Sequence, residues 1–475
     1  MEDTPQANLS EETIKELRAE VKELRERVND LLGVVERQGA EIKRLKARKP
    51  TTSRNSSKPP SSDNPFVSRP SKKRPSGKKR GGQPGHLGRG RDQAAPEDVD
   101  EVKVVKPDQC GSCSALLTGE DPSPRRHQII DIPPVDPTIL EVQLHTLLCD
   151  SCGAETKADL PDDLHASNFG PHLSALVVTL TGDKRMSRRN VQEFTRDWYS
   201  IEISLGAITN IEQRMSSGFE RGHSQAMSAV AESAVKHADE TPWKQSGALG
   251  WMWVAASALA TVFLIRSSRA TEVARELLGD EPTGITISDR YSGYLFINLD
   301  QRQVCLAHLS RDFVRMAEGE PDFRWIGARL SNALEEVFRL WHLFKGGDIK
   351  RPLLQRWTSQ LRARMFALLD EGARSSGYET PGMCRGILKT EPAMWTYLYH
   401  AGVEPTNNVG EQKARIGVMY RKVSQGTRSD RGSRFVERVL TTSATLRQQG
   451  RSVAQHIVDV AHTVLTGAPE PDLIK

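Results

Sequence analysis

The 475 residues exceed the usual size of one domain, so several folded units are expected, and 66 Lys and Arg against 61 Asp and Glu leave a net charge of only +5. The longest apolar stretch, Trp251 to Ile265, has 15 residues and is too short to span a membrane as a helix. A polar, acidic N-terminus and six cysteines fit neither a secretory signal nor a secreted disulfide scaffold, so a cytoplasmic protein is predicted.

The first predicted element, residues 11–47, is a helix with apolar residues at the spacing of a coiled coil. Its a positions are β-branched, and its d positions are leucine except for one glutamine. The a residues are Ile14, Val21, Val28, Val35 and Ile42, and the d residues are Leu17, Leu24, Leu31, Gln38 and Leu45. This combination favours a parallel two-stranded coiled coil, and therefore at least a homodimer. A single amphipathic helix packed on its own protein is the alternative.

Residues 48–100 lack apolar periodicity and are rich in Ser, Pro, Gly, Lys and Arg, so an extended linker is predicted. Between Arg69 and Arg91 this linker has nine basic residues and no acid, which leaves the rest of the chain net acidic. Such a block indicates a polyanionic partner, most often nucleic acid, and a solubilising linker is the alternative. Six of its residues are expected to bind DNA: Lys72, Lys73, Arg74, Lys78, Lys79 and Arg80.

Residues 101–160 contain two CxxC pairs, Cys110 with Cys113 and Cys149 with Cys152, separated by 35 residues. Zinc takes four soft ligands in a tetrahedron, and two such knuckles supply them. The alternating segment EVQLHTLLC predicts a strand leading into the second pair. A structural Zn²⁺ site is therefore predicted, with a redox dithiol as the alternative. The two other cysteines, Cys305 and Cys384, are expected to be buried core residues.

Residues 161–232 are predicted to be helical. Ser187 and Ser204 are plausible N-caps of two helices separated by a short break. Two short helices joined by a tight turn can form a helix-turn-helix whose second member enters the major groove, although any small helical bundle has a similar pattern. In this interpretation Arg188 and Arg189 contact the DNA phosphates.

Residues 233–309 are predicted to form short strands. Three strands, AVKHADE, WMWVAAS and TVFLIRS, precede a short helix over Thr271–Leu278, a fourth strand ends at Asp289, and QVCLAHL (Gln303–Leu309) is predicted as a fifth. Helices are expected over residues 310–400, 401–425 and 426–475. Five aromatic residues are expected in the core of the helical stretch: Trp325, Trp341, Phe344, Trp357 and Trp395. The predicted fold class is multidomain, α+β or α/β.

Acidic residues stand at the ends of these elements: Asp239 and Glu240 after the first strand, Asp289 after the fourth, and Glu411 on the late helix. Carboxylates at neighbouring strand ends can converge on hard cations such as Mg²⁺, and two cations can activate the nucleophile and stabilise the leaving oxygen of a phosphodiester. Side chains alternate along a strand, so Asp239 and Glu240 cannot both face one site without a bend. Position alone does not choose between them.

Each of these acids also has a plain structural explanation. Acids at strand ends are common as caps and turn formers. Glu411 and Arg415 are four residues apart on a predicted helix, where an ordinary ion pair would explain both. His308, on a predicted apolar strand, is expected to be a satisfied core histidine rather than a ligand.

Several motifs follow one another along nearly the whole chain. They are SRNSSKPPSSD (Ser53–Asp63), GGQPGH (Gly81–His86), the two CxxC pairs, DET (Asp239–Thr241), DRYSGY (Asp289–Tyr294), CLAHLSRDF (Cys305–Phe313) and NNVGEQKAR (Asn407–Arg415). In these motifs the chain resembles the transposases of the insertion sequence sixty-six type, which are DDE transposases. It departs from their usual pattern at Gln412, where they have arginine, and at Ile416, where they have proline.

The resemblance implies an RNase H-like catalytic core in which Asp239, Asp289 and Glu411 bind two Mg²⁺, and it favours Asp239 over Glu240. The 121 residues between Asp289 and Glu411 exceed what that core needs, so residues 310–400 are expected to be a helical insertion. Arg415, close to the catalytic glutamate, is expected to bind DNA.

The implied function is that of a DNA transposase, which binds the terminal inverted repeats of its element, cleaves the strand at each end and joins it to target DNA. The implied partners are DNA, a second copy of the chain and accessory proteins of the same element, in the bacterial cytoplasm at the nucleoid. A non-catalytic dimeric DNA-binding regulator, or a domesticated relic that keeps the fold, is the alternative. A structure-specific nuclease of the same fold lacks support from the zinc and coiled-coil modules.

Overall fold

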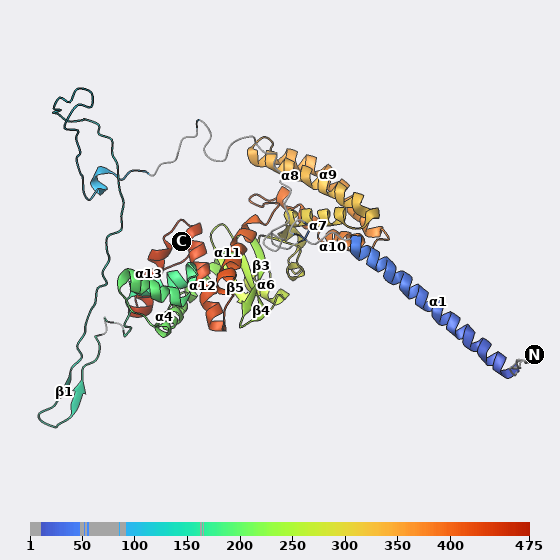
Figure 1. Ribbon diagram of the computed structural model, residues 1–475, viewed down its shortest axis with the longest axis horizontal. Coiled ribbons are helices and arrows are strands. Elements are labelled where there is room, and N and C mark those ends of the chain that lie inside the picture. The colour runs from blue at the N-terminus through green and yellow to red at the C-terminus, as the bar shows by residue number, and fades with distance from the viewer. Residues whose placement is uncertain are drawn as a thin grey trace, which may run out of the picture.

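The computed structural model describes residues 11–47, 92–161 and 166–475, together with positions 52, 55, 56, 85 and 164. Helices and a mixed β-sheet make up a multidomain α/β protein (Figure 1). Within these ranges no helix is long and apolar enough to cross a membrane.

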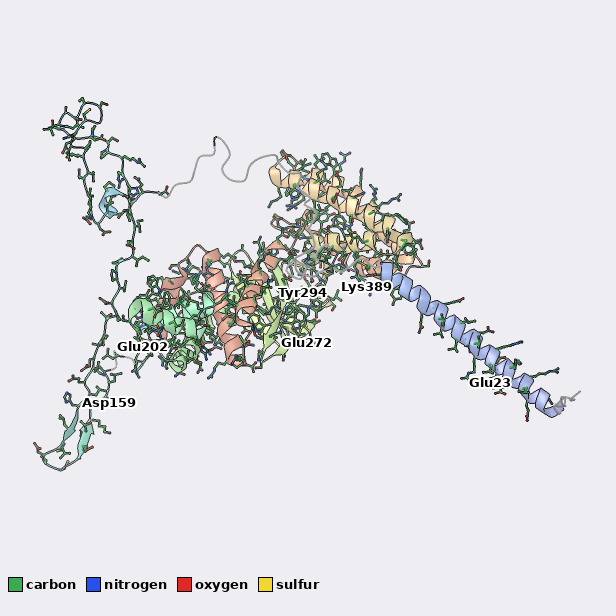
Figure 2. All side chains as sticks on the ribbon, in the orientation of Figure 1. Glu23, Asp159, Glu202, Glu272, Tyr294 and Lys389 are labelled. Carbon is green, nitrogen blue, oxygen red and sulfur yellow. The ribbon has the colours of Figure 1, made fainter. Side chains whose placement is uncertain are left out.

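The N-terminal element is one continuous helix, α1 (Glu11–Ala47), which extends away from the sheet-containing part of the molecule (Figure 1). Side chains such as Glu23 project from it into open space (Figure 2). The heptad residues whose side chains the structure describes are all exposed, from Leu17 at 46 % to Leu31 at 62 %. Among the described residues, this apolar stripe is therefore not buried against another element of the chain.

Residues 92–161 run as extended chain with little regular structure. A short 3₁₀ turn, η2 (Pro96–Asp98), comes first, and β1 (Thr146–Leu148) later pairs antiparallel with β2 (Glu155–Lys157). The strand predicted before the second CxxC pair is therefore present, but it is only three residues long. The turn between the two strands contains Cys149 and Cys152.

Residues 171–231 form the predicted helices. These are α2 (Pro171–Val178), a π-helical turn η3 (Thr179–Asp183), α3 (Arg188–Tyr199), α4 (Leu205–Gly218) and α5 (Glu220–Ala231). Both predicted serine caps are confirmed, because Ser187 accepts the amide N–H of Asn190 and Ser204 accepts that of Ala207. Each cap satisfies a backbone donor that the first helical turn leaves without a partner.

A five-stranded sheet follows, in the spatial order β5-β4-β3-β6-β7. Its strands are β3 (Val235–Gln245), β4 (Ala248–Ala256), β5 (Thr261–Arg266), β6 (Ile285–Ser288) and β7 (Arg302–Val304), with α6 (Thr271–Leu278) between β5 and β6. The first three strands are antiparallel neighbours, while β6 and β7 run parallel to β3. Ser246 and Gly247 both have positive φ, as a two-residue β3–β4 hairpin turn requires.

Side chains that alternate along the strands pack on two different layers of helices. Met252 and Val254 of β4 belong to a cluster with residues of α2, α4, α11 (Asn408–Ser424) and α12 (Asp430–Gln448). Trp253 and Ala255, one residue on in each case, belong to a cluster with residues of α5 and α6. Because helices cover both faces, β4 and β5 are almost continuously apolar rather than alternating.

The predicted fifth strand is wrong over most of its length. Strand β7 ends at Val304, and α7 (Leu306–Glu318) begins directly after Cys305, so His308 lies on a helix. The buried residues of this segment recur with helical spacing at Leu306, Leu309 and Phe313. A short apolar run does not distinguish a buried strand from the start of a buried helix, which explains the error.

Most of the remaining chain is helical, and α7 to α10 with the turns after them form a third apolar cluster with β6 and β7. The longer helices are α8 (Arg324–Gly346), α9 (Arg351–Arg374), α10 (Thr380–Leu388), α11, α12 and α13 (Val453–Thr466). The short 3₁₀ turns are η4 (Ser292–Tyr294), η5 (Leu299–Gln301), η6 (Pro321–Phe323), η7 (Pro392–Met394) and η8 (Thr396–Leu398). Helices α8 and α9 lie side by side (Figure 1).

The predicted aromatic core is partly correct. Trp341 and Trp395 are buried, and Phe344 packs against the same cluster at its edge. Trp325 and Trp357 are exposed, because they lie on the outer sides of α8 and α9, away from the apolar cluster. The two unpaired cysteines, Cys305 and Cys384, are fully buried as predicted.

Candidate active site

The prediction that the first strand ends at Asp239 is wrong, because β3 continues to Gln245 through its pairing with β4, whereas Asp289 directly follows β6 as predicted. The β3–β6 register pairs His237 with Ile287, so two residues farther along the chain Asp239 lies beside Asp289. Adjacent strands are about 4.8 Å apart, and residues opposite each other point to the same face of a sheet. The sheet therefore brings these two carboxylates together at the end of β6.

The face on which Asp239 lies is fixed by its antiparallel partner. Asp239 is paired with Val254, which packs toward α11 and α12, and Glu240 is paired with Trp253, which packs toward α5 and α6. Helix α11, which bears Glu411, contacts both β3 and β4. Asp239 and Glu411 thus occupy the same side of the sheet.

The start of α11 is attached to β3 through one buried side chain, Asn407. Its amide Nδ2 donates to the carbonyl of Ala238 at 2.7 Å, and its Oδ1 lies 3.0 Å from Nδ1 of His237. Its backbone N–H also donates to Sγ of Cys305 at 3.1 Å. Because Ala238 precedes Asp239, these bonds fix Glu411, one helical turn later, relative to that carboxylate.

The asparagine needs space that only a glycine leaves. A Cβ atom on Gly410 would lie 2.6 Å from Oδ1 of Asn407, closer than side-chain contacts allow. Farther along the helix, a Cβ on Gly417 would meet Sδ of Met252 on β4 at 2.1 Å. Glycines at these two positions let α11 lie close against the sheet.

Asp289 is held by its own turn and by a buried arginine. The amide N–H of Tyr291 donates to Oδ1 of Asp289 at 2.9 Å. Arg302 on β7 is fully buried and donates to the carbonyls of Asp289 at 2.7 Å and Tyr294 at 3.1 Å. Burial lowers the pKa of Arg302 to about 10. The backbone that presents Asp289 is therefore fixed from the neighbouring strand.

The clustered acids act on one another. Burial raises the pKa of Asp239 well above its usual range, and the charges of Glu240, Asp289 and Glu411 raise it further. In the part of the chain that the structure describes, Asp239, Asp289 and Glu411 make no ion pair with a lysine or arginine. The ionised forms of these carboxylates repel one another, and a bound cation would relieve that repulsion.

Glu240 has different surroundings, which separate it from Asp239. Arg269 donates to Oε1 of Glu240 at 2.5 Å, and the hydroxyl of Tyr294 donates to Oε2 at 2.6 Å. The guanidinium lies between the rings of Trp251 and Tyr291, 4.5 and 3.8 Å from their centroids. Both oxygens of Glu240 are engaged behind the sheet, whereas Asp239 accepts only the amide of Glu240 within the described ranges.

This network gives the DRYSGY motif a structural explanation. Tyr291 stacks on Arg269, and the hydroxyl of Tyr294, which Figure 2 labels, donates to Glu240 on the side of the sheet that α5 and α6 cover. Sequence reasoning did not find these roles. The sequence signal for these roles is the pair of tyrosines that follows Asp289. Their partners, Glu240 on β3 and Arg269 after β5, are visible only in the folded chain.

The three carboxylates fit a hard divalent cation. They offer oxygen ligands only, and Oε1 of Glu411 is a buried atom without a hydrogen-bond partner. Such a donor set suits Mg²⁺ or Mn²⁺, which prefer carboxylate oxygens and keep several waters. Asp239, Asp289 and Glu411 are therefore the residues that would hold such an ion.

The expectation for His308 is wrong. Its Nδ1 is buried without a hydrogen-bond partner and lies 3.5 Å from Oε1 of Glu411. Ligand atoms of Cys305, His308 and Glu411 all lie within 4.8 Å of one another. His308 therefore belongs to the surroundings of the acids and is not a satisfied core residue.

The other residues of the last motif point in different directions. Gln412 and Arg415 are exposed, and Ile416 is half-buried against the cluster beneath α11. Among the described residues, Glu411 forms no ion pair with Arg415, and its nearest basic group is the imidazole of His308. The plain helix-face ion pair is thus not formed.

The two CxxC pairs have the same local geometry. In each pair, the backbone N–H of the first cysteine donates to the carbonyl of the residue five positions later. The carbonyl of that cysteine accepts the backbone N–H of the residue four positions later. Amide N–H groups directed at the sulfur lower the pKa of the thiols of Cys110 and Cys149. The described chain does not bring the four sulfur atoms into one group. Each knuckle is therefore present separately.

The predicted DNA-binding residues are either outside the described residues, held in an ion pair, or exposed. Six of them, Lys72, Lys73, Arg74, Lys78, Lys79 and Arg80, lie outside the described residues. Arg188 donates to the nearly buried carboxylate of Glu212 on α4 at 2.5 Å, which joins α3 to α4. Arg189 is exposed, as are Asn210 and Arg214 on α4. These exposed polar residues are available to a partner.

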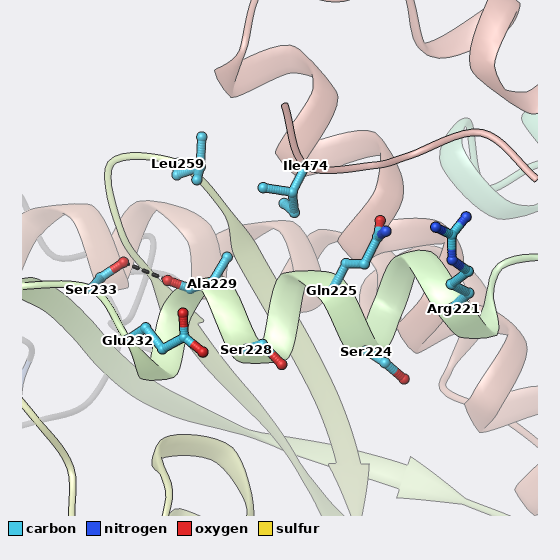
Figure 3. A pocket seen from close by; sticks show the side chains of 9 residues that line it. All are labelled: Arg221, Ser224, Gln225, Ser228, Ala229, Glu232, Ser233, Leu259 and Ile474. Atoms are coloured by element: carbon cyan, nitrogen blue, oxygen red, sulfur yellow. Dashed lines mark hydrogen bonds between the residues drawn. The ribbon is translucent and has the colours of Figure 1, made fainter.

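A surface pocket of about 610 Å³ runs along α5, on the layer opposite α11 (Figure 3). Figure 3 shows Leu259 and Ile474 facing the helix across it, and the hydroxyl of Ser233 donates to the carbonyl of Ala229 at 2.6 Å. Glu232 is the one acid in its lining, so the pocket does not contain the grouping found at Asp239.

Comparison with known proteins gives two family matches. Residues 2–92 match a family of unknown function (DUF6444). No curated protein matched the chain. Residues 166–434, more than half of the chain and a range that includes Asp239, Asp289 and Glu411, match the transposase IS66 family. The chain therefore belongs to the IS66 family of transposases.

Proposed function

We propose that this transposase binds the terminal inverted repeats of its element and catalyses metal-dependent strand cleavage and strand transfer into target DNA. The observation that carries the proposal is the convergence of Asp239, Asp289 and Glu411 from two neighbouring strands and one helix. The strand order, with three antiparallel strands followed by two parallel ones, supports an RNase H-like core.

In this mechanism Asp239, Asp289 and Glu411 would hold the divalent cations. When bound, such ions would supply Lewis-acid chemistry for the phosphodiester. Asn407 keeps Glu411 in place by tying α11 to the backbone of β3. The guanidinium of Arg302 keeps Asp289 in place by donating to the backbone carbonyl of Asp289.

DNA is the expected polymer partner of a transposase, and several surfaces support that role. Four exposed side chains are available for phosphate or base contacts. They are Arg189 on α3, Asn210 and Arg214 on α4, and Arg415 near the acids on α11. The basic linker and the two CxxC knuckles would add further contacts, and α1 would pair two subunits so that two DNA ends are held together.

The test separates binding from cleavage. Asp239→Asn, Asp289→Asn and Glu411→Gln should each lower Mg²⁺-dependent nicking of a plasmid bearing the element ends by about 10³-fold, because a metal contributes several kcal/mol to the transition state. Binding to an end fragment should change by less than about twofold. Glu272→Gln, an exposed acid on α6, is the matched control and should cleave normally.

Two results would contradict the proposal. Cleavage that survives all three substitutions would exclude these acids as the catalytic set. A wild-type protein that shifts the end fragment but never nicks the plasmid would instead be a non-catalytic regulator or relic.

A further inference from the structure

Two buried polar atoms beside the active-site acids have no hydrogen-bond partner. These are Nδ1 of His308 and Oε1 of Glu411, which lie 3.5 Å apart. Leaving a buried polar group without a partner costs about 1–3 kcal/mol. Two such atoms facing each other indicate an interaction between their side chains that a small movement would complete.

The fold holds the two residues at one junction. Cys305 precedes the first turn of α7, and the CxxH spacing places His308 in that turn. The amide of Leu306 donates to the carbonyl of Pro405 at 2.9 Å, and the amide of Asn407 donates to Sγ of Cys305. The start of α7 is thus joined to the segment that leads into α11 by one backbone hydrogen bond and by one bond to the Cys305 sulfur.

The thiol of Cys305 does not compete for this interaction. It is fully buried and already accepts the amide N–H of Asn407 at 3.1 Å. Soft metals bind the thiolate form, which such a closed, apolar position disfavours. The imidazole of His308 and the carboxylate of Glu411 therefore remain as the pair that faces each other.

We propose that His308 is a positioning residue for Glu411. With its proton on Nδ1, the imidazole donates a hydrogen bond to Oε1, and the other carboxylate oxygen is presented toward Asp239 and a divalent cation. A hydrogen bond of this kind fixes the orientation of a metal-binding carboxylate, and its loss typically costs about 10–100-fold in metal affinity. The inference rests on the proposed function, because it assigns Glu411 to a cation.

The experiment measures metal affinity in the absence of DNA, so that catalysis is not the readout. Full-length protein is titrated with Mn²⁺, and free Mn²⁺ is followed by electron paramagnetic resonance. His308→Leu should weaken binding by about 10–100-fold, and His308→Asn, which keeps a donor near the position of Nδ1, should stay within about threefold of wild type. His308→Ala serves as the loss variant if the leucine variant does not fold.

A matched control comes from another buried histidine. His456 also has a buried Nδ1 without a partner, but it lies on α13, which packs mainly on α2 and α4. His456→Leu should leave Mn²⁺ binding unchanged. A second control is Glu411→Gln, in which adding His308→Leu should produce no further loss of affinity.

Failure of the inference and failure of the proposed function give different results. If Asp239→Asn and Glu411→Gln bind Mn²⁺ as well as wild type does, the acids hold no metal and the proposed function is wrong. If those variants lose Mn²⁺ while His308→Leu does not, only the role of His308 is wrong. A Co²⁺–thiolate absorption band that disappears in Cys305→Ser would also overturn it, by making Cys305 a metal ligand.

Discussion

Neighbouring acids on one strand have opposite roles because side chains alternate. Asp239 faces α11 and the other two carboxylates, whereas Glu240 faces Arg269 and Tyr294 on the other side of the sheet. Burial raises the pKa of both groups, but only Glu240 gains a guanidinium that offsets the cost of its charge. Replacing each acid by its neutral amide should therefore change the stability of the protein differently at the two positions.

Removing the charge of Asp239 should not destabilise the metal-free protein, because it relieves repulsion from Asp289 and Glu411. Removing that of Glu240 should lower the free energy of unfolding by about 1–3 kcal/mol, because Arg269 loses its charged acceptor. Thermal unfolding in EDTA compares Asp239→Asn with Glu240→Gln. If the aspartate variant were the less stable of the two, this assignment of roles would be wrong.

At the scale of single elements, α11 depends on its first turn. Asn407 joins α11 to β3 and to Cys305, and Gly410 leaves the space that its side chain occupies. Helix propensity alone would favour alanine over glycine by about 1 kcal/mol. At position 410, close packing against Asn407 therefore favours glycine although helix propensity favours alanine.

Gly410→Ala should destabilise the protein by about 1–3 kcal/mol, because its Cβ displaces the amide of Asn407. Gly382→Ala on α10 is the matched control, since a Cβ there meets nothing within 4 Å, and it should stabilise by up to about 1 kcal/mol. Denaturant unfolding measures both. Equal effects of the two substitutions would contradict the role given to the α11 turn.

The exposed stripe of α1 predicts dimerisation through this helix. Leu24→Lys places a charge at the centre of the apolar seam and should convert a dimer to a monomer. Ala19→Lys, on the outer side of the same helix, should leave the dimer intact. Light scattering after gel filtration gives the mass, and a monomeric wild-type protein would refute the coiled coil.

Elements with a clear local signal are predictable from the sequence, whereas the boundary between β7 and α7 is not. The heptads of α1, the serine caps of α3 and α4 and the helix Thr271–Leu278 follow from local sequence. The three-residue β7 is too short to show a period, so the start of α7 was assigned to it. Trp325 and Trp357 were placed in the core because residue type alone does not reveal which side of a helix is covered.

At the scale of the whole molecule, the site joins three distant parts of the chain. The position of Asp289 after a strand was visible in the sequence, but Asp239 lies within β3 rather than at its end. The choice of Asp239 over Glu240 needed the resemblance, and the sheet register shows that Asp239 is the one on the α11 side. The contacts of Asn407, Tyr294 and His308 depend on packing between elements that are far apart in sequence. No local pattern could have supplied these partners.

The segment around the CxxC pairs has little packing of its own, which predicts dependence on zinc. Apolar residues such as Val105 and Ile139 are about nine-tenths exposed, at 90 % and 89 %. A single Zn²⁺ bound by all four cysteines would bring the two CxxC knuckles together and would cover these exposed apolar residues. Chelation should make residues 92–161 sensitive to protease while residues 171–475 stay resistant.

The matched controls are single cysteine variants. Cys149→Ser should lose the zinc measured by atomic absorption, and Cys384→Ser, a buried cysteine of the helical region, should retain it. Protein that is purified without zinc and is protease-resistant throughout would contradict this prediction.

The central claim is that Asp239, Asp289 and Glu411 share divalent cations. Crystals grown with Mn²⁺ and measured at the manganese absorption edge locate the bound ions directly. Anomalous density is expected between these three carboxylates, and it should be lost in Asp289→Asn. Density that appears elsewhere on the protein, with none between these acids, would contradict it.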